Sequence, residues 1–305
     1  MRLAQAHSTA ARADAGGVAA ERTRGYWLNT LAGLIHHPTG AIGVGLIALV
    51  VFGAIAAPLI TPMGPLEQAR GDELAGPSWS HPLGTDEFGR DILSRVLYGA
   101  RISLGVGVVA LLGGAAMGVT LGVIGGFRGG LIDTLMMRLL DVLLAFPPIL
   151  LGIAVTAVLE PSARSVGVAV MIASIPDFAR IARSATLRER SLDYVVAAAA
   201  LGVPARQIMA RHLLPNVMPP LLVQLSVAMS FAILLEAGLS FLGVGVQAPQ
   251  PSWGSMLQTA RTYLYQAPSY AVCAGVALTL LLVGFNFVAD ALRDILDPRL
   301  HRQLR

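Results

Sequence analysis

The sequence predicts an all-α integral membrane protein with six transmembrane helices. Of its 305 residues, 55% are hydrophobic and only 13% are charged, and the mean hydropathy is +0.67. A soluble domain of this size needs more charge to cover its surface. Apolar runs of about 20 residues, the length that crosses a bilayer core, recur along the chain. In lipid every backbone polar group needs an internal partner, so we expect the spans to be helices.

The N-terminal third is predicted to hold a tail, one span and a polar loop. Residues 1–40 are rich in Ala, Arg, Gly and Thr and are expected to form a tail and the lead-in to a first helix at 41–60. So long a leader does not fit a cleaved signal peptide, which favours an uncleaved anchor. Residues 61–101 carry Pro, Gly and mixed charge and are expected to form an extracytoplasmic loop.

Residues 102–289 are predicted to form a core of five further spans. The third span of the chain contains Pro147 and Pro148, and the fourth is the weakest because Pro176 and Asp177 interrupt it. The expected bounds of these five spans are 102–126, 135–159, 164–182, 217–243 and 269–289.

The arginines predict the orientation. A polar loop, 183–213, separates the fourth and fifth spans, and a tail, 290–305, follows the sixth. All 22 basic residues are arginines. With both termini inside, 16 of them lie in inner segments and 6 in outer ones, so the positive-inside rule places the termini and the 183–213 loop in the cytoplasm. Because the arginines are spread among loops, they do not indicate nucleic-acid binding.

The sequence lacks the residues that several kinds of chemistry require. A chain without lysine has no phosphate-binding Gly-x-x-x-x-Gly-Lys loop, so it is not expected to hydrolyse ATP. We find no paired catalytic carboxylates in a plausible frame and no nucleophile elbow. The six histidines are scattered and Cys273 is alone, so no metal site and no intrachain disulfide are expected.

The second span is rich in glycine. Small residues let helices approach closely in a membrane, and a glycine-rich helix is also suited to moving along a translocation path. Both interpretations stay open at this point. The glycines are Gly105, Gly107, Gly113, Gly114, Gly118 and Gly122.

Few charges fall within the apolar runs. Arg138 and Asp141 are three residues apart near the inner end of the third span, which indicates a local pair, and Asp141 is also a candidate pathway residue. Glu236 lies well inside the fifth span without a charged neighbour in sequence. A buried carboxylate is costly and faces a cavity or a partner. It either forms structural hydrogen bonds or lines a pathway.

The 183–213 loop predicts a compact knob. Residues 193–200 are good helix formers, Gly202 breaks the run, and Pro204 permits a new helix start. Two short helices that meet at a glycine, with small alanines on the surface, can seat in a rigid cleft of a soluble partner. The loop is therefore a candidate docking surface.

This loop resembles the EAA motif of binding-protein-dependent ABC-importer permeases, in which Glu-Ala-Ala, Gly and Leu-Pro recur at fixed spacing. Two positions depart from the motif: Val196 stands where the family has Glu, and His212 where it has a hydrophobic residue. Asp193, one helical turn before Val196, is our candidate for supplying the missing charge. The matching residues are Val196, Ala197, Ala198, Gly202, Leu214 and Pro215.

Further segments resemble the dipeptide/oligopeptide/nickel branch of these permeases, in its "C" subunit. Five matches in the right order, together covering nearly the whole chain beyond residue 35, make the resemblance specific. They are 81–91, 137–147, 235–243, 251–257 and 290–299. The first of them is an outer-loop signature, here Gly84, Thr85, Asp86, Gly89, Arg90 and Asp91.

The resemblance implies a type I ABC-importer permease fold in the bacterial cytoplasmic (inner) membrane. It implies import of di- or oligopeptides by ATP-driven alternating access, with nickel or another small solute as alternative cargo. The implied partners are a second permease, two ATPases that hold ATP and Mg, and an extracytoplasmic binding protein; the chain itself is expected to bind no cofactor. A different class, the ion-coupled secondary transporter, is indicated only by Glu236 and the weak fourth span.

The charged outer segment has two possible roles. Asp86, Arg90, Asp91, Arg95 and Arg101 are spaced to pair at i,i+4 on a surface helix. They would then form a self-satisfied ionic cap on the outer face. The alternative is a docking surface for the binding protein.

Overall fold

The structure, a computed structural model, describes residue 30 and the ranges 32–61 and 63–296. Five helices in these ranges are long and apolar enough to cross a membrane, and a bent helix pair adds a sixth candidate span. This confirms the predicted all-α membrane fold. The five long helices are α2 (Pro38–Ile60), α3 (Ile92–Arg128), α6 (Ala163–Glu189), α9 (Leu214–Phe241) and α11 (Pro268–Leu296).

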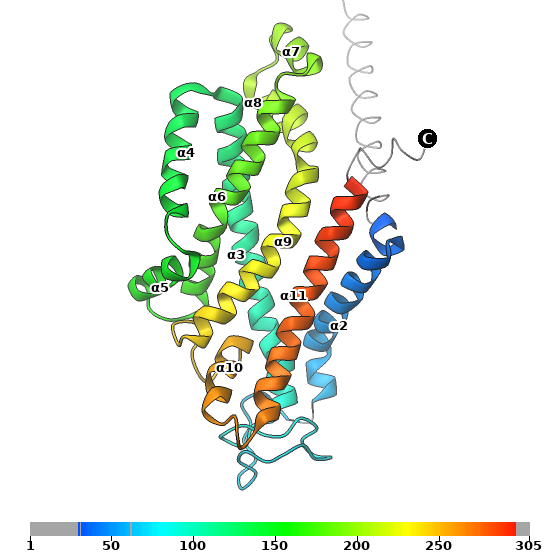
Figure 1. Cartoon of the computed structure of the whole chain (residues 1–305), viewed down its shortest axis with the longest axis vertical. Coiled ribbons are helices and arrows are strands. Elements are labelled where there is room, and N and C mark those ends of the chain that lie inside the picture. Colours follow the sequence, from blue (N-terminus) through cyan, green and yellow to red (C-terminus); the bar gives the residue numbers. More distant parts are fainter. Residues whose placement is uncertain (1–29, 31, 62, 297–305) are drawn as a thin grey trace, which may run out of the picture.

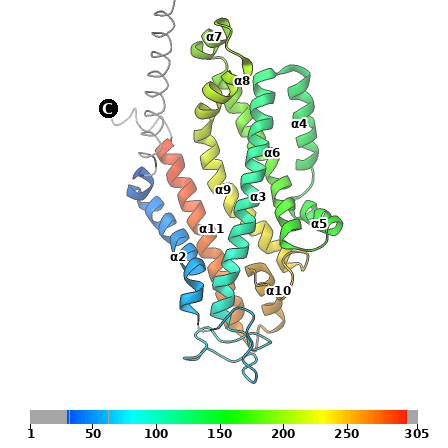
Figure 2. The ribbon, with the colours of Figure 1, turned by 180° about the vertical axis from the view of Figure 1, so that it is seen from behind.

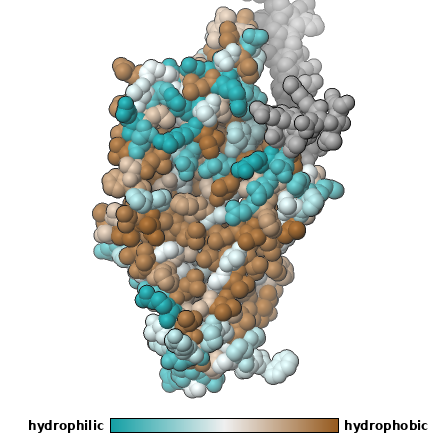
Figure 3. Space-filling model, in the orientation of Figure 1, coloured by the Kyte–Doolittle hydropathy of each residue, from teal (hydrophilic) through white to brown (hydrophobic). Residues whose placement is uncertain are grey.

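The long helices run side by side along the long axis of the molecule (Figures 1 and 2). The start of α2, the end of α11 and the short helix α7 (Asp193–Ala200) lie at one end. The 61–91 loop and α10 (Trp253–Thr262) lie at the other. On the face shown in Figure 3, a hydrophobic band lies between two more hydrophilic ends, as a bilayer requires. The segments around Tyr26 and beyond Leu296 fall outside the described residues.

A stripe of glycines joins α3 to α6. Gly114, Gly118, Gly122 and Gly126 recur at four-residue intervals, which places them on one face of α3. A Cβ atom built on Gly114 would lie 2.7 Å from the carbonyl oxygen of Met171, and one on Gly118 would lie 2.5 Å from that of Ile175. Close helix packing therefore explains this stripe. Gly105, by contrast, faces open space.

The expected continuous third span is instead a bent pair. Helix α4 (Gly130–Leu144) and helix α5 (Pro148–Leu159) meet at 89°, and Figure 1 shows α5 lying across the end of α4. Pro147 and Pro148 have no N–H to donate to the preceding turn, and a residue before proline avoids the helical region. These prolines therefore break the span rather than sit within it.

The fourth span, by contrast, is one helix. Helix α6 runs unbroken through Pro176 and Asp177, because membrane helices accommodate an internal proline when neighbours pack against it. Other bounds also differ from expectation. The outer loop ends at residue 91, so residues 92–101 are the first turns of α3 rather than loop, and α11 continues seven residues beyond 289.

Arg101 belongs to a different contact from the one predicted. Pro58 lies inside α2 and leaves the carbonyl of Ala54 without its helical donor. Arg101 Nε donates to that oxygen at 2.6 Å and Nη2 donates to the carbonyl of Ile55 at 3.1 Å. The guanidinium also stacks on the ring of Tyr98, 4.6 Å from its centroid. Arg101 therefore fastens α3 to α2 and takes no part in the outer ion pairs.

Candidate functional site

The loop predicted at 183–213 is shorter in the structure, because α6 continues to Glu189. It contains the knob that the sequence predicts, which we define as residues 193–213. Helix α7 is followed by a turn at Gly202, by the short helix α8 (Ala205–Gln207) and by a π-helical turn, η1 (Ile208–Leu213), which leads directly into α9. Gly202 has φ +76°, a conformation that side chains with a Cβ rarely adopt. The glycine thus allows the chain to turn back so that η1 packs against α7.

A small apolar cluster holds the knob together. Val195 and Ala198 of α7 pack with Ile208 and Leu213 of η1, and all four are buried. Phe127, at the end of α3, packs against them. The knob therefore rests on the end of the longest helix as a folded unit.

The opposite face of the knob is uncovered. Leu201 is 84% exposed and Val196 is 56% exposed, and Asp193 and Ala197 are exposed beside them. Uncovered aliphatic side chains on a protruding element indicate a contact surface. Of the remaining motif residues, Ala198 is buried in the knob, whereas Leu214 and Pro215 lie in the first turn of α9.

A tyrosine connects the knob to the helices on both sides of it, which the sequence did not reveal. The hydroxyl of Tyr194 in α7 donates to Glu189 Oε2 of α6 at 2.8 Å and accepts from Asn216 Nδ2 of α9 at 3.1 Å. Asn216 also donates to the carbonyl of His212 at 2.6 Å. Burial, and then the bond to Glu189, raise the pKa of Tyr194 to about 12, so the hydroxyl stays protonated at neutral pH.

Two arginines at the end of α6 hold neighbouring helices. Arg183 makes a two-pronged pair with Asp133 of α4 at 2.5 and 2.6 Å. Arg190 donates to the carbonyl oxygens of Gly126 and Phe127 in the last turn of α3, at 2.8 and 3.3 Å. Sequence reasoning used these arginines only to orient the chain. Their partners lie 50 or more residues away.

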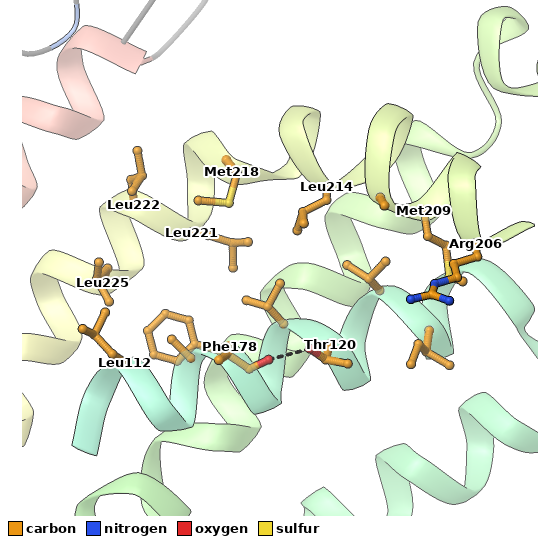
Figure 4. A pocket seen from close by; sticks show the side chains of 16 residues that line it. Leu112, Thr120, Phe178, Arg206, Met209, Leu214, Met218, Leu221, Leu222 and Leu225 are labelled. Atoms are coloured by element: carbon orange, nitrogen blue, oxygen red, sulfur yellow. Dashed lines mark hydrogen bonds between the residues drawn. The ribbon is translucent and has the colours of Figure 1, made fainter. Parts of the chain in front are cut away.

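A groove of about 530 Å³ adjoins the knob. Helices α3, α6 and α9 form its walls together with the knob, and Figure 4 shows Arg206 at one end of a row of apolar side chains. Arg206 is the charged group of this lining. The hydroxyl of Thr120 is already used, because it donates to the carbonyl of Ala116 within α3 at 2.7 Å. The labelled residues are Leu112, Thr120, Phe178, Arg206, Met209, Leu214, Met218, Leu221, Leu222 and Leu225.

The candidate pathway residue Asp141 pairs across helices. The predicted local pair with Arg138 is replaced by a pair with Arg180 of α6, whose Nη2 lies 2.6 Å from Asp141 Oδ1. Both side chains are about half exposed. The bend at Pro147 ends α4 shortly after Asp141 and so leaves this carboxylate beside α6.

Glu236 is wholly buried and is not among the residues that line the groove. Its Oε1 accepts from the hydroxyl of Ser240 at 2.9 Å, and the hydroxyls of Ser103 in α3 and Ser252 at the start of α10 also face the carboxyl group. The carboxyl group therefore lies where α3, α9 and α10 meet, and its buried Oε2 accepts no hydrogen bond in the described part of the chain. This buried position, away from the groove, favours the structural role over the pathway role.

The outer-loop signature centres on Asp86. One carboxylate oxygen accepts from the backbone N–H groups of Phe88 and Arg90, each at 2.9 Å. The other lies 2.6 Å from Arg90 Nε and 3.1 Å from Arg95 Nε. All three charged side chains are buried. The Asp86–Arg90 pair at i,i+4 forms as predicted, but in a loop rather than on a surface helix.

The remaining signature residues shape the same loop. Asp91 accepts from the N–H of Ser94 at 2.8 Å and so caps α3, while its other oxygen lies 3.2 Å from His81 Nδ1. Thr85 donates to the carbonyl of Asp72. Gly84 and Gly89 have φ of +85° and +71°, the left-handed region that favours glycine. The signature thus builds an ionic cap over the N-terminal end of α3.

Comparisons with known proteins extend the resemblance found in the sequence. Residues 118–302 match the family described as "Binding-protein-dependent transport system inner membrane component". The chain is 41% identical over 274 residues to the dipeptide transport system permease protein DppC of Alkalihalophilus pseudofirmus, covering 90% of each chain. It is 45% identical over 225 residues to the glutathione transport system permease protein GsiD of Pectobacterium atrosepticum, covering 74% of this chain and 75% of that protein.

The fold is also found among solved structures. A chain from the MetNI methionine ABC transporter in inward facing conformations superposes with a TM-score of 0.55 at 19% identity, covering 66% of this chain and 96% of that one. This likeness supports the predicted type I importer permease fold. The family match and the sequence identities show that the chain belongs to the family of binding-protein-dependent transport system inner membrane components.

Proposed function

We propose that the chain is the permease subunit of a binding-protein-dependent ABC importer and that it carries di- and oligopeptides across the bacterial cytoplasmic membrane. Curated relatives that match most of its length are transport permeases for dipeptides, di/tripeptides or glutathione. Glutathione is itself a tripeptide, so these relatives share a peptide backbone as cargo. Cargo choice is shared with the binding protein, and therefore peptide import is the part of the proposal that most needs a direct test.

The observation that carries the proposal is that the knob and the groove share a wall. Arg206 and Met209 belong to the knob, Leu214 begins α9, and all three line the groove. A displacement of the knob therefore changes the shape of the groove without an intermediate element. The π-helical turn η1, which joins the rest of the knob to α9, is a form of helix that often marks functional sites.

The proposed cycle uses this shared wall. ATP binding closes two partner ATPases whose clefts hold the knobs of this chain and of a second permease. The knobs then move their α9 helices and open the path toward the outer side, where an extracytoplasmic binding protein releases the cargo. Hydrolysis resets the complex. In this proposal the chain binds no nucleotide or metal, and the knob and both termini face the cytoplasm.

Asp193 is our candidate for the charge that the motif loses at Val196. Both residues are exposed and lie three apart on α7, so their side chains share one face of the helix. A carboxylate at Asp193 could reach the part of an ATPase cleft that the motif glutamate would contact. Val196 itself would then make an aliphatic contact.

The test is purification of the tagged chain in mild detergent, followed by mass spectrometry of what accompanies it and by transport in proteoliposomes. We expect two Walker-type ATPases, a second six-span permease and ATP-dependent uptake of labelled dipeptide in the presence of the binding protein. Parallel vesicles receive labelled nickel, the alternative cargo. A chain that is recovered alone and transports with an ion gradient but without ATP would contradict the proposal.

A further inference from the structure

A second, polar cavity lies at the opposite end of the molecule from the knob. It holds about 170 Å³. One wall is the ionic cap, with Glu87, Arg90 and Arg95, and the other is the segment 243–259. Three glutamines of that segment, Gln247, Gln250 and Gln258, also line it. The proposed coupling between the knob and the groove does not involve this cavity.

Buried polar atoms around this cavity lack partners in the described part of the chain. Glu87 Oε1 pairs with Arg90 Nη2 at 3.0 Å, whereas its Oε2 is buried and accepts no hydrogen bond. Arg95 Nε lies 3.1 Å from Asp86 Oδ2, but no hydrogen bond is formed there. Buried polar groups are nearly always satisfied in folded proteins, so these two atoms call for a partner.

A third such atom lies within electrostatic reach of the same charges. The hydroxyl of Tyr270, at the start of α11, is buried without a hydrogen-bond partner, and the charges of Arg95 and Glu87 act on it. Tyr270 is not among the residues that line the cavity, so the open atoms that belong to the cavity walls are the carboxylate oxygen of Glu87 and the guanidinium N–H of Arg95. A single occupant with both donors and acceptors would satisfy them.

The chemistry of the walls identifies the class of occupant. Glu87 Oε2 offers an acceptor to a cation, and Arg95 offers a donor to an anion, from residues that line one small space. The glutamine amides can both donate and accept. Each charged group already has one ion-pair partner, Arg90 for Glu87 and Asp86 for Arg95, so the charges around the cavity balance. A ligand that carries both charges keeps that balance, whereas a purely cationic or purely anionic ligand does not.

We propose that this cavity binds a small zwitterion of the α-amino acid type, with its ammonium group at Glu87 and its carboxylate at Arg95. A free amino acid and a short dipeptide share this chemistry and are the two sources. Naming the dipeptide as a source rests on the proposed function; the cavity itself does not. The site would give a released peptide a first contact on the permease.

The experiment measures binding to the full chain in nanodiscs, without the binding protein. The probes are L-alanine and L-alanyl-L-alanine, and two analogues that each lack one charge, L-alaninamide and N-acetyl-L-alanine. We expect saturable binding of at least one zwitterion. Both analogues should bind about tenfold more weakly or worse, because each loses one charge-assisted hydrogen bond. The probe that binds more tightly identifies the source.

Variants locate the binding. Glu87→Gln keeps the size of the side chain and should weaken binding of the zwitterion about tenfold. Glu67→Gln is the matched control, since Glu67 is an exposed carboxylate of the same loop outside the cavity lining. Gln250→Trp narrows the exposed rim without touching the ionic cap, so it tests the site even if Glu87→Gln does not fold.

The outcomes separate this inference from the proposed function. Saturable binding that both Glu87→Gln and Gln250→Trp weaken, and Glu67→Gln does not, supports the site. The inference is overturned if no probe saturates, in which case the cavity holds water only, or if the analogues bind as well as the zwitterions. Transport of dipeptide that is normal in both cavity variants, with no binding detected, would leave the importer standing and remove only this site.

Discussion

The ionic cap and the knob, at opposite ends of the molecule, are both irregular segments next to helix ends, but they bury opposite kinds of side chain. The cap buries charges: Asp86, Arg90 and Arg95 form ion pairs with one another beneath the surface. The knob buries a few aliphatic residues and leaves others, such as Leu201, in contact with solvent. The cap is thus held together by ion pairs within the chain, whereas the knob presents a surface that something else must cover.

This difference predicts where each region acts. Changes in the cap should alter the stability of the chain itself. Changes on the exposed face of the knob should leave the stability of the chain nearly unchanged and alter its assembly with a partner. The variants below test this division.

The largest effect is expected at Asp86. Asp86→Asn removes the carboxylate that Arg90 and Arg95 share, so that Arg95 is left buried without its ion pair and Arg90 keeps only Glu87. Removing one member of a buried pair costs about 3–5 kcal/mol. Thermal unfolding in detergent measures it. Glu67→Ala, in the same loop but exposed, serves as the control and should change stability little. Equal unfolding temperatures for the two variants would show that the ion pairs of the cap do not stabilise the chain.

The next effect concerns the exposed face of the knob. The double variant Val196→Asp, Leu201→Asp places charge on exposed aliphatic positions. Surface changes of this kind alter the free energy of unfolding by about 0.5 kcal/mol or less, but they should weaken retention of the ATPases more than about tenfold because charge is excluded from the centre of an interface. Pull-down and thermal unfolding of the same preparation measure both. A destabilised chain that still retains ATPases would reverse the comparison.

A smaller effect is expected at Tyr194. Tyr194→Phe keeps the ring and removes the hydroxyl that joins Glu189 and Asn216, a loss of about 0.5–1.5 kcal/mol for each hydrogen bond. We expect ATPase subunits to bind normally, while peptide transported per ATP hydrolysed falls. Tyr265→Phe is the matched control, because Tyr265 is fully exposed. An unchanged ratio in Tyr194→Phe would show that the contact transmits nothing.

The smallest effect is expected at Asp193. An exposed charge contact is worth about 1 kcal/mol or less, so Asp193→Ala should lower coupled transport only a few-fold. Val196→Glu, which restores the family motif, should recover the loss. Coupling that is the same in the wild type and in Asp193→Ala would mean that the knob works without this charge.

Much of the fold could be predicted from the hydrophobic runs and from the glycines and prolines that interrupt them. The knob was predictable because Gly202 and Pro204 act locally. The bend at Pro147 was not separable from the unbroken helix at Pro176, although both are prolines in apolar runs, because packing of α6 against α3 decides the second case.

The long-range contacts were beyond the sequence. Arg183 finds Asp133 50 residues away and Arg101 finds Ala54 47 residues away, and a periodic pattern carries no information on such pairs. Composition placed these arginines on a side of the membrane but not on a partner. The groove was likewise unpredictable, since it depends on how far α3 and α9 separate near the knob.

The glycine stripe of α3 has a consequence for how this sequence can vary. Backbone atoms of α6 lie where a methyl group on Gly114 or Gly118 would have to be, so even alanine should be rejected there in a saturation mutagenesis screen for growth on peptides. The apolar residues of α3 that line the groove, among them Leu112 and Val119, face its open space and should accept other apolar residues. A map of tolerated substitutions along α3 would therefore alternate between fixed and variable positions with the pitch of the helix.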